Sequence, residues 1–295
     1  MEGNVLILGG TGTLGRELIR QLDGKCMSIT VLSRDEHKQQ LMKRQYPNVR
    51  FVLGDIRDLS SIEDHFREKD VVFHVAALKH IDHLEENPIE SMKTNVLGTI
   101  NVAKAAINAE VRYCVFSSTD KAVDPINTYG YCKALSEKIL LQMNYDQSIT
   151  RFSIFRWGNV LNSQGSVIPY FIDLLRKGDP IPITSKEMTR FWIRIEDAVE
   201  FMINTFRSGE TKTKVMVHPE MRASKLTDVI SVLGEMTDNH SQNFKMIGLR
   251  KGEKLHEALR SQHSESPICS KTCKQYSTNE LHALLGPLVN ATTRK

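Results

Sequence analysis

The stretch Val5-Leu6-Ile7-Leu8-Gly9-Gly10-Thr11-Gly12-Thr13-Leu14-Gly15 decides the fold of this chain. Its first four residues form a short continuous apolar run, which is typical of a strand buried on both faces of a parallel sheet. Gly10, Gly12 and Gly15 then match the G-x-G-x-x-G pattern just before an amphipathic helix, Leu14–Leu22. Because the N–H groups and dipole at the start of such a helix favour a pyrophosphate, the stretch predicts a dinucleotide-binding turn.

Two of the apolar runs that follow end at residues suited to the adenosine half of a dinucleotide. Ser28–Ser33 ends at Arg34 and Asp35, where an arginine would hold a ribose 2′-phosphate and an acidic residue a 2′-hydroxyl. Arg34 favours NADP, but an Arg34 that only meets solvent or Asp35 is the alternative, so NAD stays open. Val49–Leu53 is followed by Gly54 and Asp55, and Asp55 could accept a hydrogen bond from the adenine amine or could only cap its loop.

A fourth run, Val71–Ala77, ends in small alanines that would let a cofactor backbone approach closely, and Lys79 and His80 follow in the loop. Residues 87–109 then carry apolar side chains at helical spacing, which predicts one long helix. Asn95 is a polar residue on that helix. It could contact the cofactor or could be an interior amide satisfied by the protein itself.

The segment Ser117–Lys133 gathers the reactive side chains. It follows the apolar run Tyr113–Phe116 and carries the adjacent charged pair Asp120 and Lys121, as expected where a buried strand ends at a ligand crevice. Tyr129 and Lys133 share one face of the next helix, and an ammonium beside a phenol lowers the pKa of the phenol. We therefore expect Tyr129 to act as a base near neutral pH. An ordinary helical Tyr and Lys, and a structural ion pair of Asp120 with Lys121, are the alternatives.

Five strands alternating with helices up to this segment predict an α/β fold, a Rossmann-type doubly wound parallel sheet with ligands above its carboxyl edge. Phe152–Arg156 adds one more strand. We expect this dinucleotide-binding domain at residues 1–157, rejoined by residues 188–218. The βα rhythm weakens after it, so residues 158–295 are expected to form mainly a smaller C-terminal substrate-binding lobe and a tail.

Composition excludes several classes of protein. The net charge is only +4, with no basic run, which argues against a nucleic-acid partner and favours a small anionic ligand. No apolar stretch reaches about 18 residues and no basic leader precedes the first strand, so we expect a soluble cytoplasmic protein with no membrane partner. The five scattered cysteines indicate a reducing compartment. His80 and His83 have no third ligand nearby, so we expect no metal site.

Several motifs together carry a family resemblance. They are Gly9–Gly15, Ala76–His80, Ser118–Ala122, Tyr129-x-x-x-Lys133, Arg156-x-Gly158-Asn159-Val160, Met188–Trp192 and Gly252–Glu257. The chain resembles the extended short-chain dehydrogenase/reductase superfamily and, within it, the inverting UDP-N-acetylglucosamine 4,6-dehydratases (5-epimerising), to about residue 260. The pair Asp120 and Lys121 distinguishes the inverting dehydratases within the superfamily, because retaining dehydratases usually have Asp-Glu at these two positions. One departure is Gln164, where the family usually has an arginine.

The resemblance implies a UDP-sugar substrate, bound NADP and a homo-oligomer. It assigns catalysis to Thr119, Asp120, Lys121, Tyr129 and Lys133. The implied cofactor contacts are Gly9, Thr11, Gly12, Thr13, Leu14, Gly15, Arg34, Asp55, Ile56, Ala76, Ala77, Lys79, Asn95, Tyr129 and Lys133. The implied substrate contacts are Lys79, His80, Asn159, Arg190, Arg250, Glu253 and Lys254.

The resemblance also implies a reaction. Tyr129 would take the proton of the sugar 4-hydroxyl, to which Thr119 hydrogen-bonds, while hydride leaves carbon 4. Lys121 would then remove the proton at carbon 5 while Asp120 protonates the departing 6-hydroxyl, and reprotonation from the opposite face would invert carbon 5. The product would be a UDP-4-keto-6-deoxy-L-hexosamine. The alternatives are a UDP-sugar 4-epimerase, a retaining 4,6-dehydratase, and a non-catalytic NADP-binding sensor.

Overall fold

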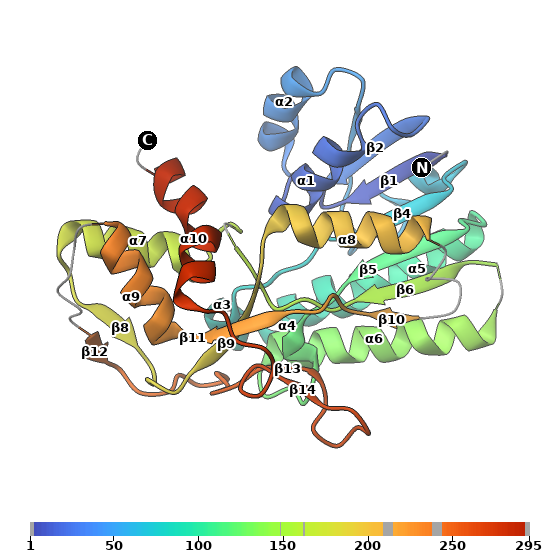
Figure 1. The fold of residues 1–295 in the computed structure, drawn as a ribbon. Helices are drawn as coiled ribbons and strands as arrows, with labels where there is room; N and C mark the ends of the chain where they lie inside the picture. Colours follow the sequence, from blue (N-terminus) through green and yellow to red (C-terminus); the bar gives the residue numbers. More distant parts are fainter. Residues whose placement is uncertain (1–2, 148, 162, 209–214, 238–243, 293–295) are drawn as a thin grey trace. The chain divides into compact units, whose positions relative to one another are not determined.

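The structure is a computed structural model, in which the chain divides into two compact units (Figure 1). It describes residues 3–147, 149–161, 163–208, 215–237 and 244–292. The first unit comprises Met1–Arg156 and Glu196–His218, and the second comprises Trp157–Ile195 and Pro219–Lys295. Among the described residues, no helix is long and apolar enough to cross a membrane.

The first unit is built on a parallel seven-stranded sheet with the strand order β10-β6-β5-β4-β1-β2-β3. Its strands are β1 (Asn4–Leu8), β2 (Ser28–Ser33), β3 (Arg50–Leu53), β4 (Val71–His74), β5 (Tyr113–Ser117), β6 (Arg151–Phe155) and β10 (Met216–Val217). From β1 the chain adds β2 and β3 on one side and then β4, β5 and β6 on the other, which is the change of direction seen in a doubly wound sheet. The predicted Rossmann-type α/β fold is confirmed.

Helices cover both faces of this sheet. Phe152 and Ile154 of β6 share a core with Leu140 of α6 (Thr128–Asp146), whereas Phe155 lies against Phe201 of α8 (Ile195–Arg207), with ring centroids 6.0 Å apart. The other helical segments of the unit are α1 (Thr13–Leu22), α2 (Glu36–Gln45), η1 (Glu63–Phe66), α3 (Ile81–Glu86), α4 (Pro88–Ser91), η2 (Met92–Leu97), α5 (Gly98–Asn108) and η3 (Asp120–Ala122).

The prediction of a single long helix over residues 87–109 is wrong for the middle of that segment. Residues Met92–Leu97 form a π-helical turn, η2, between α4 and α5. In this turn the backbone carbonyl of Asn95 accepts hydrogen bonds from the hydroxyls of Thr99 and Ser136, each at 2.7 Å. These side-chain partners satisfy the carbonyl where the regular α-helical pattern is interrupted, and π-helical turns of this kind are frequent at functional sites.

In its described residues, the second unit contains smaller sheets and three helices. One sheet has the order β11-β9-β7, from β7 (Asn159–Val160), β9 (Thr189–Ile193) and β11 (Arg222–Lys225). The remaining elements are α7 (Val167–Lys177), β8 (Ile181–Ile183), α9 (Leu226–Met236), β12 (Phe244–Met246), β13 (Ala258–Arg260), β14 (Ile268–Cys269) and α10 (Thr278–Thr292). The expected return to the first unit at residue 188 is therefore too early: β9 pairs with β7 and β11, and the chain returns only at Glu196.

Candidate active site

The glycine turn connects β1 to α1. The helix begins at Thr13, and Gly12, which precedes it, provides no side-chain cap, so the helix presents the N-terminus that favours an anion. A Cβ at Gly15 would lie 2.3 Å from the Cα of Gly10. Only glycine at position 15 therefore allows the first turn of α1 to pack this closely on the loop.

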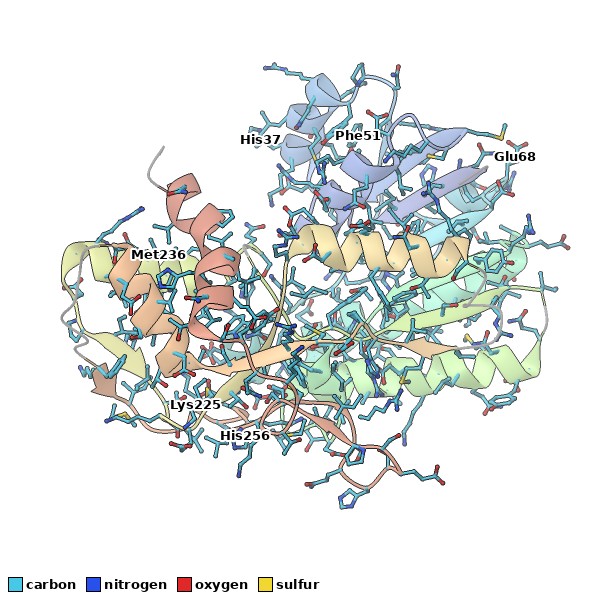
Figure 2. The ribbon with its side chains drawn as sticks, in the orientation of Figure 1. His37, Phe51, Glu68, Lys225, Met236 and His256 are labelled. Atoms are coloured by element: carbon cyan, nitrogen blue, oxygen red, sulfur yellow. The ribbon has the colours of Figure 1, made fainter. Side chains whose placement is uncertain are left out.

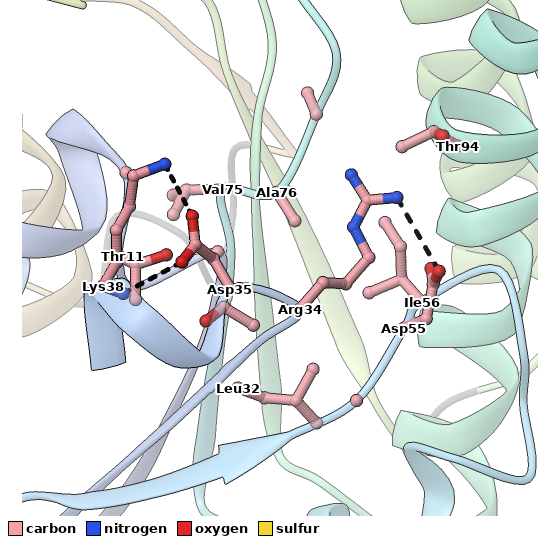
Figure 3. Close-up of a pocket in the computed structure, with 15 residues that line it drawn as sticks. Thr11, Leu32, Arg34, Asp35, Lys38, Asp55, Ile56, Val75, Ala76 and Thr94 are labelled. Carbon is pink, nitrogen blue, oxygen red and sulfur yellow. Dashed lines mark hydrogen bonds and ion pairs between the residues drawn. The ribbon is translucent and has the colours of Figure 1, made fainter. Parts of the chain in front are cut away.

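A pocket of about 520 Å³ lies beside this turn, at the carboxyl ends of β1, β2, β3 and β4 (Figure 3). The predicted cofactor residues that line it are Gly9, Thr11, Gly12, Arg34, Asp55, Ile56, Ala76 and Ala77. Thr13, Leu14, Gly15, Lys79, Asn95, Tyr129 and Lys133 are not among its lining residues. The pocket thus brings together residues predicted to contact the pyrophosphate and the adenosine of the cofactor.

Charged side chains line the far end of this pocket. Asp35 caps α2, accepting a hydrogen bond from the Lys38 N–H at 2.9 Å, and its carboxylate pairs with the Lys38 ammonium at 2.8 Å. Arg34 lies 3.7 Å from the Asp55 carboxylate (Figure 3). Burial opposes ionisation of Asp55, but hydrogen bonds from Arg57 and the charge of Arg34 hold the pKa of this carboxyl below its usual range.

Two polar residues of this pocket, Lys38 and Thr94, were not recognised from the sequence. Lys38 was predictable, because a residue three positions after the capping Asp35 lies on the same side of the first turn of α2. Thr94 has no comparable signal. Its side chain is 4% exposed, its hydroxyl has no hydrogen-bond partner, and it lines the pocket. Since buried polar groups are normally satisfied, this hydroxyl fits a polar group of a bound ligand.

Asn95 acts on the neighbouring loop. Its amide oxygen accepts from the Leu78 N–H at 2.9 Å, and its amide nitrogen donates to the Leu78 carbonyl at 2.8 Å. Asn95 is therefore the satisfied interior amide considered as the alternative, and it fixes the backbone between the pocket alanines and Lys79. Lys79 and His80 themselves are exposed in that loop.

The predicted acid–base residues lie together just after β5. Asp120 is fully buried, and its Oδ1 accepts hydrogen bonds from the Thr119 hydroxyl and from Lys121 Nζ, both at 3.0 Å. Its other oxygen, Oδ2, is buried and has no hydrogen-bond partner. Asp120 and Lys121 thus form the ion pair considered as the structural alternative, yet one carboxylate oxygen is left unused.

Helix α6 brings Tyr129 to the same place. The helix begins at Thr128, where Asn127 caps it by accepting from the Gly130 N–H at 2.7 Å. A Cβ at Gly130 would lie 2.3 Å from the Lys121 carbonyl oxygen, so glycine lets the first turn of α6 press against the Lys121 backbone. Tyr129 hydrogen-bonds with the Thr119 side chain, and the charges of both Lys121 and Asp120 act on its pKa.

The expected lowering of the Tyr129 pKa by Lys133 is wrong in this structure. Burial raises the pKa of Tyr129 to about 12, and Lys121, rather than Lys133, is the cation that opposes this effect. Lys133 is 2% exposed, and its ammonium donates to the Ser117 carbonyl at 2.6 Å and lies 3.9 Å above the Phe116 ring. Burial lowers the pKa of Lys133 to about 7. The helical spacing predicted that Tyr129 and Lys133 share one face, but it gave no information on how deeply each side chain is buried, and burial dominates both pKa values.

In the second unit, the buried Arg190 joins three of the predicted substrate residues into one cluster. Its guanidinium donates to the carbonyls of Thr189, Lys254 and Leu255 at 2.8, 2.9 and 3.2 Å, and lies 3.7 Å from the Glu253 carboxylate. Arg190 therefore holds the 253–255 segment in place, a different role from the predicted phosphate contact.

The other predicted substrate residues of this unit lie around that cluster or on β7. Arg250 is exposed, and its N–H donates to the Glu253 carboxylate at 3.4 Å. Lys254 Nζ lies 3.8 Å from the Glu257 carboxylate. His256, labelled in Figure 2, shares a hydrogen bond of 2.8 Å with the Thr189 hydroxyl. Asn159 lies on β7, paired in register with Trp192. The described residues contain no group of three or more metal-ligating side chains.

Comparison with known proteins places the chain in a family. The family model described as polysaccharide biosynthesis protein matches residues 5–278. A UDP-N-acetylglucosamine 4,6-dehydratase (inverting) from Campylobacter jejuni is 39% identical over 266 residues, covering 87% of this chain and 77% of that protein. A UDP-glucose 4-epimerase from Rickettsia akari is 37% identical over 268 residues, covering 88% and 78%. The X-ray structure of Pen from Bacillus thuringiensis has a TM-score of 0.88 and 31% identity, covering 97% of both chains. The chain therefore belongs to the polysaccharide biosynthesis protein family of extended short-chain dehydrogenases/reductases.

Proposed function

We propose that this chain is a UDP-N-acetylglucosamine 4,6-dehydratase that inverts carbon 5, a lyase that releases water and forms a UDP-4-keto-6-deoxy-L-hexosamine. The proposal rests on one observation: the carboxylate of Asp120, with one buried oxygen that has no partner, is paired with the ammonium of Lys121 beside Thr119 and Tyr129. An acid and a base side by side are what the elimination of water needs. The 39% identity to the inverting dehydratase of C. jejuni supports it.

We infer that a nicotinamide dinucleotide binds at the glycine turn. The uncapped start of α1, the close packing that Gly15 permits and the unpartnered Thr94 hydroxyl all fit such a ligand. The cations of Arg34 and Lys38 at the far end of the pocket favour NADP over NAD. When bound, the nicotinamide would supply the hydride acceptor for carbon 4 and the hydride donor for carbon 6.

Tyr129 would accept the proton of the 4-hydroxyl, with Thr119 as its hydrogen-bonding partner. Because the pKa of Tyr129 is raised to about 12 by burial, the phenolate depends on nearby positive charge. Lys121 is the cation that lowers this pKa. We therefore expect Lys121 to influence the first proton transfer as well as the elimination.

The ion pair itself can supply both forms that the elimination requires. Moving one proton over the 3.0 Å from Lys121 Nζ to Asp120 Oδ1 turns the pair into a neutral amine and a carboxylic acid. The amine can then take the proton from carbon 5, and the acid can give its proton to the departing 6-hydroxyl. One proton transfer therefore prepares both groups.

The substrate side of the proposal uses one exposed cation, Arg250, and one that is largely buried, Lys254. Arg250 and Lys254 are proposed to meet the substrate diphosphate, while Arg190 holds the backbone that carries Lys254. Asn159, Glu253, Lys79 and His80 are proposed as further substrate contacts. Gln164, where the family usually has an arginine, would remove one charge from phosphate binding.

Incubation of the purified chain with UDP-N-acetylglucosamine tests the function. Mass spectrometry should find loss of water, and proton NMR in deuterated water should find deuterium at an inverted carbon 5. A 4-epimerase, the function named for the R. akari relative, would give an isomer of unchanged mass. A retaining dehydratase would keep the configuration at carbon 5, and a non-catalytic sensor would bind cofactor without turnover.

A further inference from the structure

A buried carboxylate on α6 takes no part in the mechanism above. Glu137 is 3% exposed and accepts two hydrogen bonds from the Arg156 guanidinium, at 2.9 and 2.6 Å. It also accepts a 2.5 Å hydrogen bond from the Ser118 hydroxyl. Arg156 follows β6 and Ser118 follows β5, so this carboxylate ties α6 to the ends of two neighbouring strands.

The same carboxylate lies on the catalytic face of α6. Tyr129, Lys133 and Glu137 follow one another at intervals of four residues, so they share one side of the helix. Ser118, which Glu137 holds, directly precedes Thr119, and its N–H donates to the Phe155 carbonyl at 2.6 Å. Glu137 is therefore joined to the active stretch both through the helix and through the strand end.

Lys133 is a buried ammonium whose direct contacts are neutral, namely the Ser117 carbonyl and the Phe116 ring. The titratable groups that act on it are Glu137 and Cys132 from α6 and His74 from β4. Burial lowers the pKa of His74 to about 3, so His74 is neutral near pH 7. Burial also lowers the pKa of Lys133, and the charge of Glu137 is the main influence that opposes it.

We propose that Glu137 is a positioning residue for this site: its carboxylate fixes Ser118 and Arg156 at the strand ends and supplies a counter-charge that favours the ammonium form of Lys133. The proposal deepens the proposed function and rests on it only for the activity measurement. A mere brace between α6 and the sheet would need the hydrogen bonds of Glu137 but not its charge.

The variant Glu137→Gln separates these two roles, because it keeps the size of the side chain and an acceptor oxygen but removes the charge. Lys133 can be titrated by NMR in protein labelled with ¹³C at the lysine ε-carbons, with the resonance assigned from Lys133→Arg. We expect the midpoint for Lys133 to fall by about one pH unit or more in Glu137→Gln. The alkaline limb of the dehydratase pH profile should move in the same direction.

The matched control is Ser118→Ala, which removes one hydrogen bond from Glu137 and leaves its charge, so the Lys133 midpoint should stay where it is in the parent. If Glu137→Gln does not fold, the double variant Glu137→Met with Arg156→Met removes the buried carboxylate together with the guanidinium that pairs with it, and Lys133 is titrated in the same way. An unchanged Lys133 midpoint in the folded variant would overturn the proposal. The titration uses no substrate, so a chain that fails to dehydrate UDP-N-acetylglucosamine still gives a decisive result.

Discussion

Asp120 in the first unit and Arg190 in the second are both charged and almost fully buried, but they use their hydrogen-bonding capacity differently. Arg190 donates to three backbone carbonyls and so stabilises a segment of its own unit. Asp120 has one oxygen engaged by Thr119 and Lys121 and the other without a partner. Burying an unsatisfied polar atom costs stability, so it persists where function needs it. The comparison supports the chemistry proposed for Asp120 and a structural role for Arg190.

The largest expected effect is the loss of the cation beside Asp120. In Lys121→Met we expect formation of the 6-deoxy product to fall by about 10³-fold, since the base for carbon 5 and the charge acting on Tyr129 are both removed. Product is measured by mass spectrometry. Binding of cofactor and the circular dichroism spectrum should be retained. Lys177→Met, which removes an exposed lysine paired with Asp173, is the control. Undiminished turnover in Lys121→Met would exclude this lysine from the mechanism.

The next effect tests the other side of the comparison. Replacing Arg190 by methionine should lower the free energy of unfolding by about 3 kcal/mol, because three carbonyls lose a charged donor. Urea denaturation measures this change. Arg250→Ala, at an exposed position, should instead leave stability within about 0.5 kcal/mol and raise KM for the UDP-sugar. An Arg190 variant with unchanged stability and a raised KM would show that Arg190 is a phosphate ligand after all.

The sequence predicted those parts of the fold that depend on neighbours in the chain. Buried parallel strands are continuous apolar runs, so β1, β2, β4 and β5 stood out, and the glycine turn followed from its place between a strand and a helix. The expected position of β9 was wrong because a fully buried strand fits a core in either unit equally well. The π-helical turn at Asn95 could not be predicted either, since the Ser136 hydroxyl that supports it lies 41 residues away.

The candidate site was predictable to a similar extent. The cluster of Thr119, Asp120 and Lys121 follows directly from their place after β5, although their catalytic roles stay predictions. Two of the three carbonyls that accept from Arg190 lie 64 and 65 residues further along the chain, which no local pattern reveals. Spacing placed Tyr129 and Lys133 on one face but carried no information on burial, and burial decides both pKa values.

Lys133 is a third buried ionisable group, and its direct contacts, the Ser117 carbonyl and the Phe116 ring, are neutral. Its titration therefore tests how burial affects a charged side chain. Its pKa is about 7 in the folded chain and near 10.5 in an unfolded one, so between these values the unfolded chain binds the extra proton. Stability contributed by this group therefore rises with pH. We expect the free energy of unfolding to increase by about 2 kcal/mol between pH 7 and 9 in the parent, relative to Lys133→Met. Lys138→Met, at an exposed position of α6, should follow the parent. A parent and a Lys133→Met variant with parallel pH profiles would contradict the burial argument.

The smallest expected effect concerns an exposed charge that is only loosely held, the opposite extreme from Asp120. Arg34 is 49% exposed in its side chain and lies 3.7 Å from Asp55, a separation at which an ion pair adds little stability. Its guanidinium can therefore turn to a 2′-phosphate at little cost. We expect Arg34→Ala to weaken NADP binding about tenfold, or about 1.4 kcal/mol, and to leave NAD nearly unaffected, as measured by calorimetric titration of both. Arg44→Ala, an exposed arginine of α2 that does not line the pocket, should change neither affinity. An equal loss of affinity for both dinucleotides would mean that Arg34 supports the pocket without contacting the 2′-phosphate. Asp35 and Lys38 would then be the residues that determine the preference between NADP and NAD.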